Sequence, residues 1–273
     1  MACLTGLVLQ VGTGLAQEDD PLLEGRLLRS AASQESQGDL RGAESILTEL
    51  MQARPTSTGG LFALERVLRA QGRIRDVLPV AEHYQEIAPE VAAPRVLALR
   101  VYSELGAGEE LEAAADAWLD RAGSAPEPYR EVSRALLKVI GPESALAALE
   151  RGRREIGESS LFALEIGDLL RDVGRLDEAV LEWTQVIGDD GTPVAAIMRR
   201  VRELEGEDRE RIKPMLDALG RSPTTVARRR AGARIAMEAG LVDEALRLGA
   251  AALDDLSGQV RRGFLTALAR QAE

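Results

Sequence analysis

Apolar stretches with the length and spacing of helices recur along this chain, and single glycines in polar turns interrupt them at a regular period. The glycines that mark the pattern are Gly38, Gly72, Gly106, Gly141, Gly174, Gly206 and Gly240. Their successive spacings are 34, 34, 35, 33, 32 and 34 residues. A period of about 34 residues is typical of arrays built from a helix, a tight turn and a second helix. The pattern therefore predicts seven helical hairpins in tandem.

Each of the seven units is expected to contain a first and a second helix. The expected first helices are 22–37, 58–71, 93–105, 127–140, 160–173, 193–205 and 225–239. The expected second helices are 40–53, 75–88, 109–122, 143–156, 176–188, 208–219 and 242–256. Residues 258–273 are expected to form one more helix, and its arginines Arg261, Arg262 and Arg270 give it a polar face suited to capping a solenoid.

Three further regularities support the period. In the first, fifth and seventh units an alanine lies five residues after the glycine, where a small side chain would let the two helices approach closely; these are Ala43, Ala179 and Ala245. In three units a proline lies 17 residues after the glycine, where it would end the second helix; these are Pro55, Pro89 and Pro223. The pentapeptide Leu61–Glu65 recurs as Leu161–Glu165, which is 100 residues or three periods later.

With these features the chain resembles a tetratricopeptide repeat protein of a bacterial, exported type over about residues 22–257. The fifth unit carries the family pattern most fully, with Gly174 in the turn, Ala179 five residues later, Trp183 nine residues later and Gly167 as the small residue of the first helix. The resemblance implies an all-α superhelix, a solenoid of about seven hairpins plus a capping helix, whose first helices line a concave binding face.

The third, fourth and sixth units depart from the family pattern. Leu111 and Arg211 stand where a small residue is expected, and Pro214 falls inside the predicted second helix 208–219. Proline removes a backbone N–H and obstructs the preceding turn of a helix. We therefore expect these units to be kinked or offset in phase.

Composition agrees with an all-α fold and excludes several classes of function. Only 8 of the 273 residues are aromatic, while the strong helix formers alanine and leucine dominate. The net charge of −11 would repel a phosphate backbone, so no nucleic-acid partner is expected. Cys3 is the only cysteine and His83 the only histidine, which excludes an intrachain disulfide and a Cys/His zinc site. We expect neither a metal nor a cofactor.

The N-terminal segment differs from the rest of the chain. The first 17 residues carry no charged side chain, and Leu4–Ala16 form a 13-residue apolar stretch that is too short to span a bilayer. Small residues, Gly14 and Ala16, occupy the −3 and −1 positions of a signal-peptidase site, and acidic residues follow. This pattern predicts a signal peptide over 1–16 with cleavage after Ala16, a single helical-repeat domain over 17–273, and a periplasmic or secreted protein. Because no Lys or Arg precedes the apolar stretch, a cytoplasmic chain is the alternative.

No constellation of residues in the sequence predicts catalysis. A nucleophile–histidine–acid arrangement would have to use His83, which lies in the middle of a predicted second helix, where a surface or core role is the simpler interpretation. The acidic pairs Asp189–Asp190 and Asp254–Asp255 lie at helix ends without the further oxygen ligands that a divalent-ion site requires. Trp118 and Trp183 lie on second helices and are expected in the core. We therefore predict a protein that is not an enzyme.

The strongest candidate for a binding site is a row of arginines on the first helices. The ninth position of each first helix is expected to point into the groove, and in the seven units it is Ala32, Arg66, Arg100, Ala135, Asp168, Arg200 and Arg234. The fifth position adds Arg230 and the twelfth adds Arg69 and Arg171. A guanidinium group is a planar fork of donors that matches a carboxylate. Arg66, Arg100, Arg200, Arg230 and Arg234 are therefore candidate residues for binding acidic or C-terminal peptide carboxylates. The simpler interpretation is that arginine-rich codon usage places arginine on every exposed helical face.

The sequence thus favours a scaffold or adaptor that binds partner proteins or peptides through the concave face of a solenoid. The alternative is a structural or assembly subunit of a cell-envelope or secretion complex, which would use its outer or end surfaces. A third class, a helper domain of an enzyme, has less support. The partner and the oligomeric state are not specified by the sequence.

Overall fold

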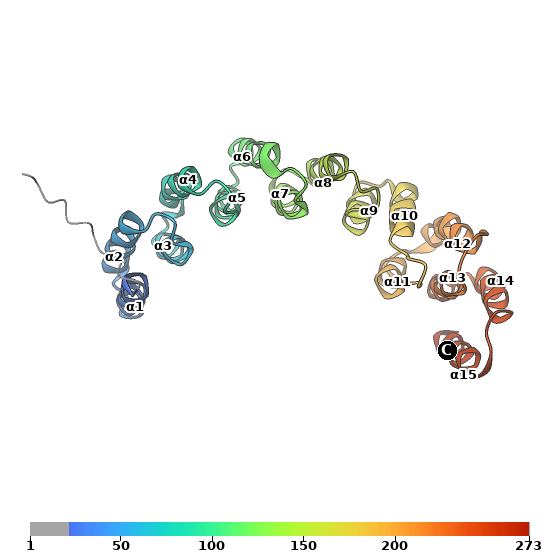
Figure 1. The fold of residues 1–273 in the computed structure, drawn as a ribbon. Coiled ribbons are helices and arrows are strands. Elements are labelled where there is room, and N and C mark those ends of the chain that lie inside the picture. The colour runs from blue at the N-terminus through green and yellow to red at the C-terminus, as the bar shows by residue number, and fades with distance from the viewer. Residues whose placement is uncertain (1–21, 273) are drawn as a thin grey trace, which may run out of the picture. The chain divides into compact units, whose positions relative to one another are not determined.

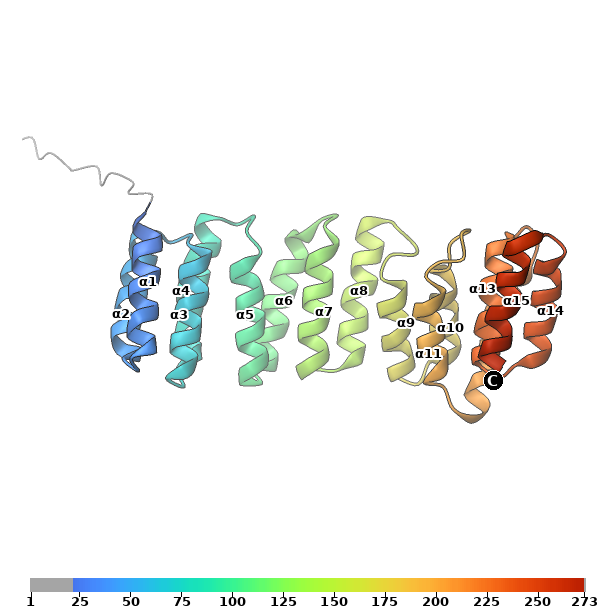
Figure 2. The same cartoon turned by 90° about the horizontal axis from the view of Figure 1, so that it is seen from below.

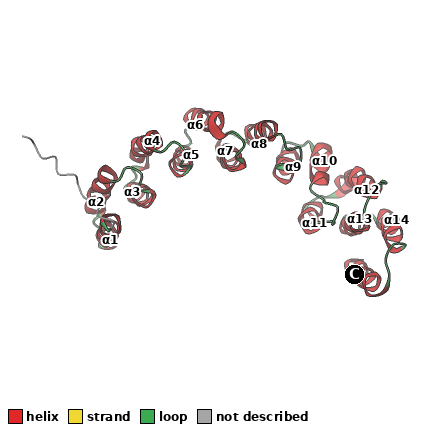
Figure 3. Cartoon of the chain, viewed as in Figure 1, coloured by secondary structure: helices red, strands yellow, loops and turns green. Residues whose placement is uncertain are grey.

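The structure, a computed structural model, describes residues 22–272, and every regular element in this range is helical (Figure 1 and Figure 3). The predicted all-α fold of tandem helical hairpins is confirmed. The predicted signal peptide, residues 1–16, lies outside the described residues.

Helices occur at every place where the repeat predicts one. The first helices are α1 (Leu23–Ser36), α3 (Thr58–Ala70), α5 (Ala93–Leu105), α7 (Pro126–Val139), α9 (Ala163–Asp172), α11 (Val194–Arg202) and α13 (Val226–Glu238). The second helices are α2 (Leu40–Ala53), η1 (Ile74–Val77) with α4 (Leu78–Ile87), α6 (Gly108–Ala122), α8 (Pro142–Ile156), α10 (Leu176–Gln185), η2 (Gly206–Ile212) with α12 (Lys213–Gly220), and α14 (Val242–Leu253). The final helix is α15 (Gly258–Ala272).

Contacts divide the chain into two compact units, and the boundary falls between Leu97 and Ala98, inside α5. The first unit contains α1 to α4, with α2 packed against both α1 and α3. In the second unit each first helix packs against the second helix of its own hairpin and against the second helix that precedes it, as α9 does with α10 and α8. That a single domain spans residues 17–273 stays a prediction.

Within the second unit the helices form two rows (Figure 1 and Figure 2). One row, here called the inner row, consists of α7, α9, α11, α13 and α15. The other, here called the outer row, consists of α6, α8, α10, α12 and α14. The interior between the rows is closed by large apolar side chains such as Trp183, Ile166 and Ile197, each at most 1% exposed.

All seven glycines that define the repeat have a positive φ, between 52° and 137°. The backbone at six of them ends the first helix with a bond typical of this cap, as when the Arg175 N–H donates to the Leu170 carbonyl at 2.8 Å. A Cβ at Gly174 would meet nothing within 4 Å. The turn therefore requires glycine for its backbone conformation, not for lack of space.

Replacing Gly174, whose φ is +80°, with alanine is expected to lower the free energy of unfolding by about 1–2 kcal/mol, because a Cβ disfavours the left-handed conformation. Gly174→Asn should cost less, since asparagine tolerates this region better than other residues with a side chain. Urea denaturation of the two variants and the parent measures the difference. Equal losses for alanine and asparagine would contradict a purely conformational cause.

The small residues predicted between paired helices are buried. Ala43, Ala179 and Ala245 are at most 2% exposed, and Leu111, which replaces the alanine in the third unit, is also buried. Trp118 and Trp183 lie in the core as predicted, at 6% and 0% exposure.

Two second helices differ from the prediction because each contains a proline. The continuous helices expected over 75–88 and 208–219 are each a 3₁₀ segment followed by an α-helix, with Pro79 and Pro214 in the first turn of α4 and α12. Proline cannot donate to the preceding turn, so the α-helix begins at that point. In the sixth unit the change of phase places Ile212 in the core at 0% exposure and leaves Arg211 outside.

Candidate interaction surface

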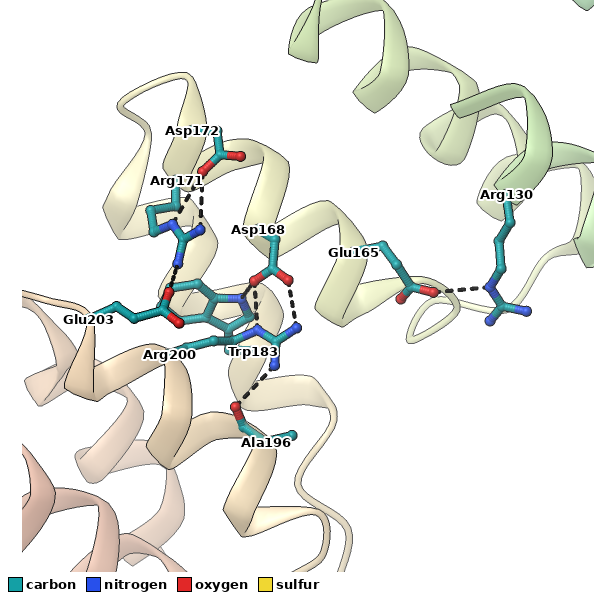
Figure 4. A network of polar contacts seen from close by, with 9 residues as sticks. All are labelled: Arg130, Glu165, Asp168, Arg171, Asp172, Trp183, Ala196, Arg200 and Glu203. Atoms are coloured by element: carbon teal, nitrogen blue, oxygen red, sulfur yellow. Dashed lines mark hydrogen bonds and ion pairs between the residues drawn. The ribbon is translucent and has the colours of Figure 1, made fainter. Parts of the chain in front are cut away.

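The side chains at the centre of the inner row form a network that joins consecutive first helices (Figure 4). Asp168 on α9 accepts hydrogen bonds from both sides of the Arg200 guanidinium on α11, at 2.6 Å to Nε and 2.5 Å to Nη2. Asp168 also accepts from the indole N–H of Trp183 at 3.2 Å, and Arg200 Nη1 donates to the Ala196 carbonyl at 3.0 Å. The Arg200 side chain is only 9% exposed, so this carboxylate is its main compensation for lost hydration.

More exposed ion pairs continue the network on either side. Arg171 on α9 pairs with Glu203, which follows α11, at 2.8 Å. Arg130 on α7 pairs with Glu165 on α9 at 2.9 Å and lies over the ring of Phe162, 4.9 Å from its centre. Phe162 is buried in a left-handed conformation just before α9, which therefore begins at Ala163 and not at residue 160 as expected. Consecutive first helices are thus tied together by one ion pair after another.

The five arginines predicted to line a groove lie in different settings. Arg66, on α3 of the first unit, donates to both carboxylate oxygens of Glu35 at 2.8 and 2.7 Å. Arg100 lies on α5, the helix that contains the unit boundary, and has an interaction partner, as has Arg234 on α13. The Arg230 guanidinium, also on α13, lies 5.3 Å from the centre of the Phe264 ring on α15. Arg200, Arg230 and Arg234 therefore share the inner row of the second unit.

The acidic partners of these arginines are the residues that sequence reasoning missed. Glu35 lies 31 residues before Arg66, and Asp168 lies 32 residues before Arg200. A signal was present, because Asp168 and Arg200 occupy the same ninth position in consecutive units. Opposite charges one period apart on the same face are expected to meet across neighbouring repeats.

A shallow pocket of about 250 Å³ opens on the inner row between α7 and α9. Its lining combines charged and apolar residues: Arg130, Ser133, Arg134, Leu137, Leu149, Glu165, Asp168, Leu169 and Asp172. Leu137 is 43% exposed, which is unusual for a large apolar side chain beside a pocket. The pocket could receive an apolar side chain of a partner while its charged rim contacts polar groups around it.

The Glu35–Arg66 pair gives a prediction for pH dependence. Hydrogen bonds from Arg66, followed by its charge, lower the pKa of Glu35 below its usual value. Because the folded-state pKa is the lower one, the pair contributes stability above the unfolded-state pKa, and this stability is lost as the pH falls through the folded value. In Arg66→Gln the carboxyl of Glu35 should titrate at higher pH than in the parent, which carboxyl NMR measures directly. An unchanged titration would contradict the assigned cause.

The described residues show no arrangement suited to catalysis at the places that the sequence singled out. The His83 side chain is 61% exposed, and its Nδ1 lies 3.5 Å from Glu86. Asp190 accepts from the backbone N–H and hydroxyl of Thr192, and these bonds lower its pKa. Asp255 pairs with Arg229 at 2.8 Å. No group of three or more His, Cys, Asp and Glu side chains among residues 22–272 could hold a metal ion.

In the part of the chain that the structure describes, no helix is long and apolar enough to cross a membrane.

The tandem hairpins, their glycine turns and their period define a tetratricopeptide-like helical-repeat protein. No family model and no curated protein matches the chain. Among solved structures, a tetratricopeptide repeat protein from Parabacteroides merdae ATCC 43184 is 16% identical, covers 90% of this chain and 98% of its own, and has a TM-score of 0.45. The MamA protein is 12% identical over 68% of this chain and 98% of its own, with a TM-score of 0.42. The flexible tandem repeat domain of bacterial cellulose synthase is 17% identical over 79% of this chain and 96% of its own, with a TM-score of 0.33.

Proposed function

We propose that this chain is a non-enzymatic scaffold that binds a protein or peptide partner on the inner row of its helices. The observation that carries the proposal is the pocket between α7 and α9, where exposed Leu137 lies among charged side chains on helices joined by the Arg130–Glu165 pair. Binding sites on mutually fixed helices lose little conformational entropy when a partner docks. Arg66, Arg100, Arg200, Arg230 and Arg234 remain proposed contacts for carboxylates of a partner.

The test compares two variants that make the same change on opposite rows. Leu137→Glu alters the pocket, while Leu181→Glu alters α10 of the outer row, where Leu181 is 56% exposed. Partners are isolated by cross-linking to the purified chain, identified by mass spectrometry, and rebound as purified proteins in calorimetry. We expect Leu137→Glu to weaken binding and Leu181→Glu to leave it unchanged. Equal binding by both variants would reject the inner row as the binding surface.

The competing role is a structural or assembly subunit. It predicts self-association of the purified chain in gel filtration and contacts through the outer row or the ends. In that case Leu181→Glu, and not Leu137→Glu, would change the assembly. A monomer that enlarges only when its partner is added supports the scaffold.

We also propose that residues 1–16 are a signal peptide and that the mature protein is periplasmic or secreted. The support is the uncharged apolar stretch that ends in small residues and is followed by an acidic start. N-terminal sequencing of the protein from cells should then begin at Gln17. A cytoplasmic protein that still begins at Met1 would refute the proposal.

A further inference from the structure

The last three helices of the inner row have an unusual charge composition. Together α11, α13 and α15 carry ten arginines and one acidic residue, Glu238. Each helix has a net charge of +3, although the whole chain has a net charge of −11. The positive charge of this acidic protein is therefore concentrated at one end of one row.

The neighbouring helices do not share this composition. On the same row α7 has a net charge of +1 and α9 of −2. On the outer row beside these helices η2 and α14 each have a net charge of −1. Arginine-rich codon usage would place arginine on all exposed faces, but it does not explain why acidic residues are nearly absent from α11, α13 and α15. The depletion of acidic residues is thus the informative feature.

The three helices are neighbours in space and form one surface. In the second unit α13 packs against both α11 and α15. Phe264 of α15 is only 2% exposed, and the Arg230 guanidinium of α13 lies over its ring. Because this contact fixes α15 beside α13, their arginines belong to a single patch, here called the basic end.

Several arginines of the basic end are open to a partner. Arg199 and Arg202 lie on the exposed face of α11, and Arg261 and Arg262 are exposed on α15. Arg202 pairs with Glu238 at 2.6 Å, but no carboxylate among residues 22–272 pairs with Arg199, Arg261 or Arg262. The other arginines serve the fold: Arg200 binds Asp168, Arg228 donates to the Ile187 carbonyl, and Arg229 pairs with Asp255.

We propose that the basic end binds an acidic segment of a partner polypeptide, an inference that rests on the proposed scaffold function and names the chemistry of its partner. Guanidinium groups bind carboxylates through paired hydrogen bonds. Helices pack about 8–10 Å apart, so the axes of α11 and α15 lie about 20 Å from each other, which about six extended residues span. The segment runs across the three helices and contacts Arg199 at one side and Arg262 at the other.

The distribution of charge favours an acidic polypeptide over other polyanions. A planar anionic membrane could reach α15 but would approach the acidic α14 beside it. A long phosphate backbone would extend past the basic end onto α9, whose net charge is −2. A short acidic segment fits within the basic end and avoids both sources of repulsion.

The experiment measures binding of a fluorescent oligoglutamate peptide of about eight residues, long enough to span three helices, by anisotropy. The variant Arg199→Glu/Arg262→Glu reverses two charges of the basic end. The matched control Arg121→Glu/Arg154→Glu reverses two exposed arginines of the outer row and changes the net charge equally. Circular dichroism confirms that both fold. We expect the first variant to bind at least about tenfold more weakly, the control to bind like the parent, and parental binding to weaken as salt is added.

Three results would overturn the inference: no binding of oligoglutamate by the parent, equal weakening in both variants, or tighter binding of phosphatidylserine-rich vesicles or single-stranded DNA than of the peptide. The proposed scaffold function is judged separately by the Leu137→Glu and Leu181→Glu pair. A chain that binds its partner with Leu137 dependence but without any effect of Arg199→Glu/Arg262→Glu keeps the scaffold function and loses the acidic partner.

Discussion

Replacing Asp168 with alanine is expected to lower the free energy of unfolding by about 3 kcal/mol, because it leaves the guanidinium of Arg200 buried without its carboxylate. The Arg200 side chain is 9% exposed, and water cannot restore its lost hydrogen bonds without opening the interface between α9 and α11. The same change removes the acceptor of the buried Trp183 indole N–H. Because Asp168 itself is 34% exposed, the effect lies at the lower end of what breaking a buried pair costs.

The matched control is Asp172→Ala on the same helix. Asp172 pairs with Arg171 at 3.1 Å, and their side chains are 47% and 29% exposed, so its loss should cost less than about 1 kcal/mol. A second variant, Asp168→Leu/Arg200→Met, removes the buried charge together with its partner and should recover much of the stability. Urea denaturation of all three separates these outcomes. If Asp168→Ala and Asp172→Ala destabilise equally, the pair with Arg200 is not an important support of the interface.

The positions of the helices could be predicted from the sequence because a local requirement marks each hairpin. A first helix that turns sharply into a second needs a residue with positive φ, and glycine adopts it at the lowest cost. Gly38, Gly174 and Gly240 therefore recur at the period of the structure and are visible without any three-dimensional information. Local sequence also held the cause of the main errors in the fold, since Pro79 and Pro214 limit where α4 and α12 can begin.

The candidate site was less accessible to sequence reasoning because it depends on contacts between repeats. Position within a helix showed that Arg200 faces the inner row, but not that Asp168 one period earlier would neutralise it. Likewise, Arg66 could be placed on a first helix but not assigned to Glu35. These pairings require the distance between neighbouring repeats and the length of each side chain, which the repeat period alone does not give.

Ion pairs and binding compete for the same arginines on the inner row. Arg130, Arg171 and Arg200 each hold a carboxylate of a neighbouring element, which stabilises the stack and leaves less of their charge for a partner. At the basic end, acidic residues are nearly absent and Arg199 and Arg262 stay open. The row is thus divided into a part whose charges are satisfied within the chain and a part whose charges are available for a partner.

The close approach of α9 and α10 yields the second large effect. A Cβ on Gly167 would lie 2.4 Å from Nε1 and 2.5 Å from Cδ1 of Trp183, and 3.1 Å from the Ala179 carbonyl oxygen. Trp183 is 0% exposed, so its ring cannot move aside without disturbing the core. Gly167→Ala gains about 1 kcal/mol of helix propensity, but inserting a methyl group into a closely packed core costs about 1–3 kcal/mol or more. We expect a net loss of about 2 kcal/mol.

Gly263→Ala provides the control, because a Cβ at Gly263 in α15 meets nothing within 4 Å. This variant keeps the gain in helix propensity without the clash and should stabilise its helix by up to about 1 kcal/mol. Thermal unfolding compares the two variants, and the NMR signal of the Trp183 indole N–H reports whether its bond to Asp168 survives. If Gly167→Ala stabilised the protein as Gly263→Ala does, then α9 and α10 would not be held at the distance that the fully buried indole imposes.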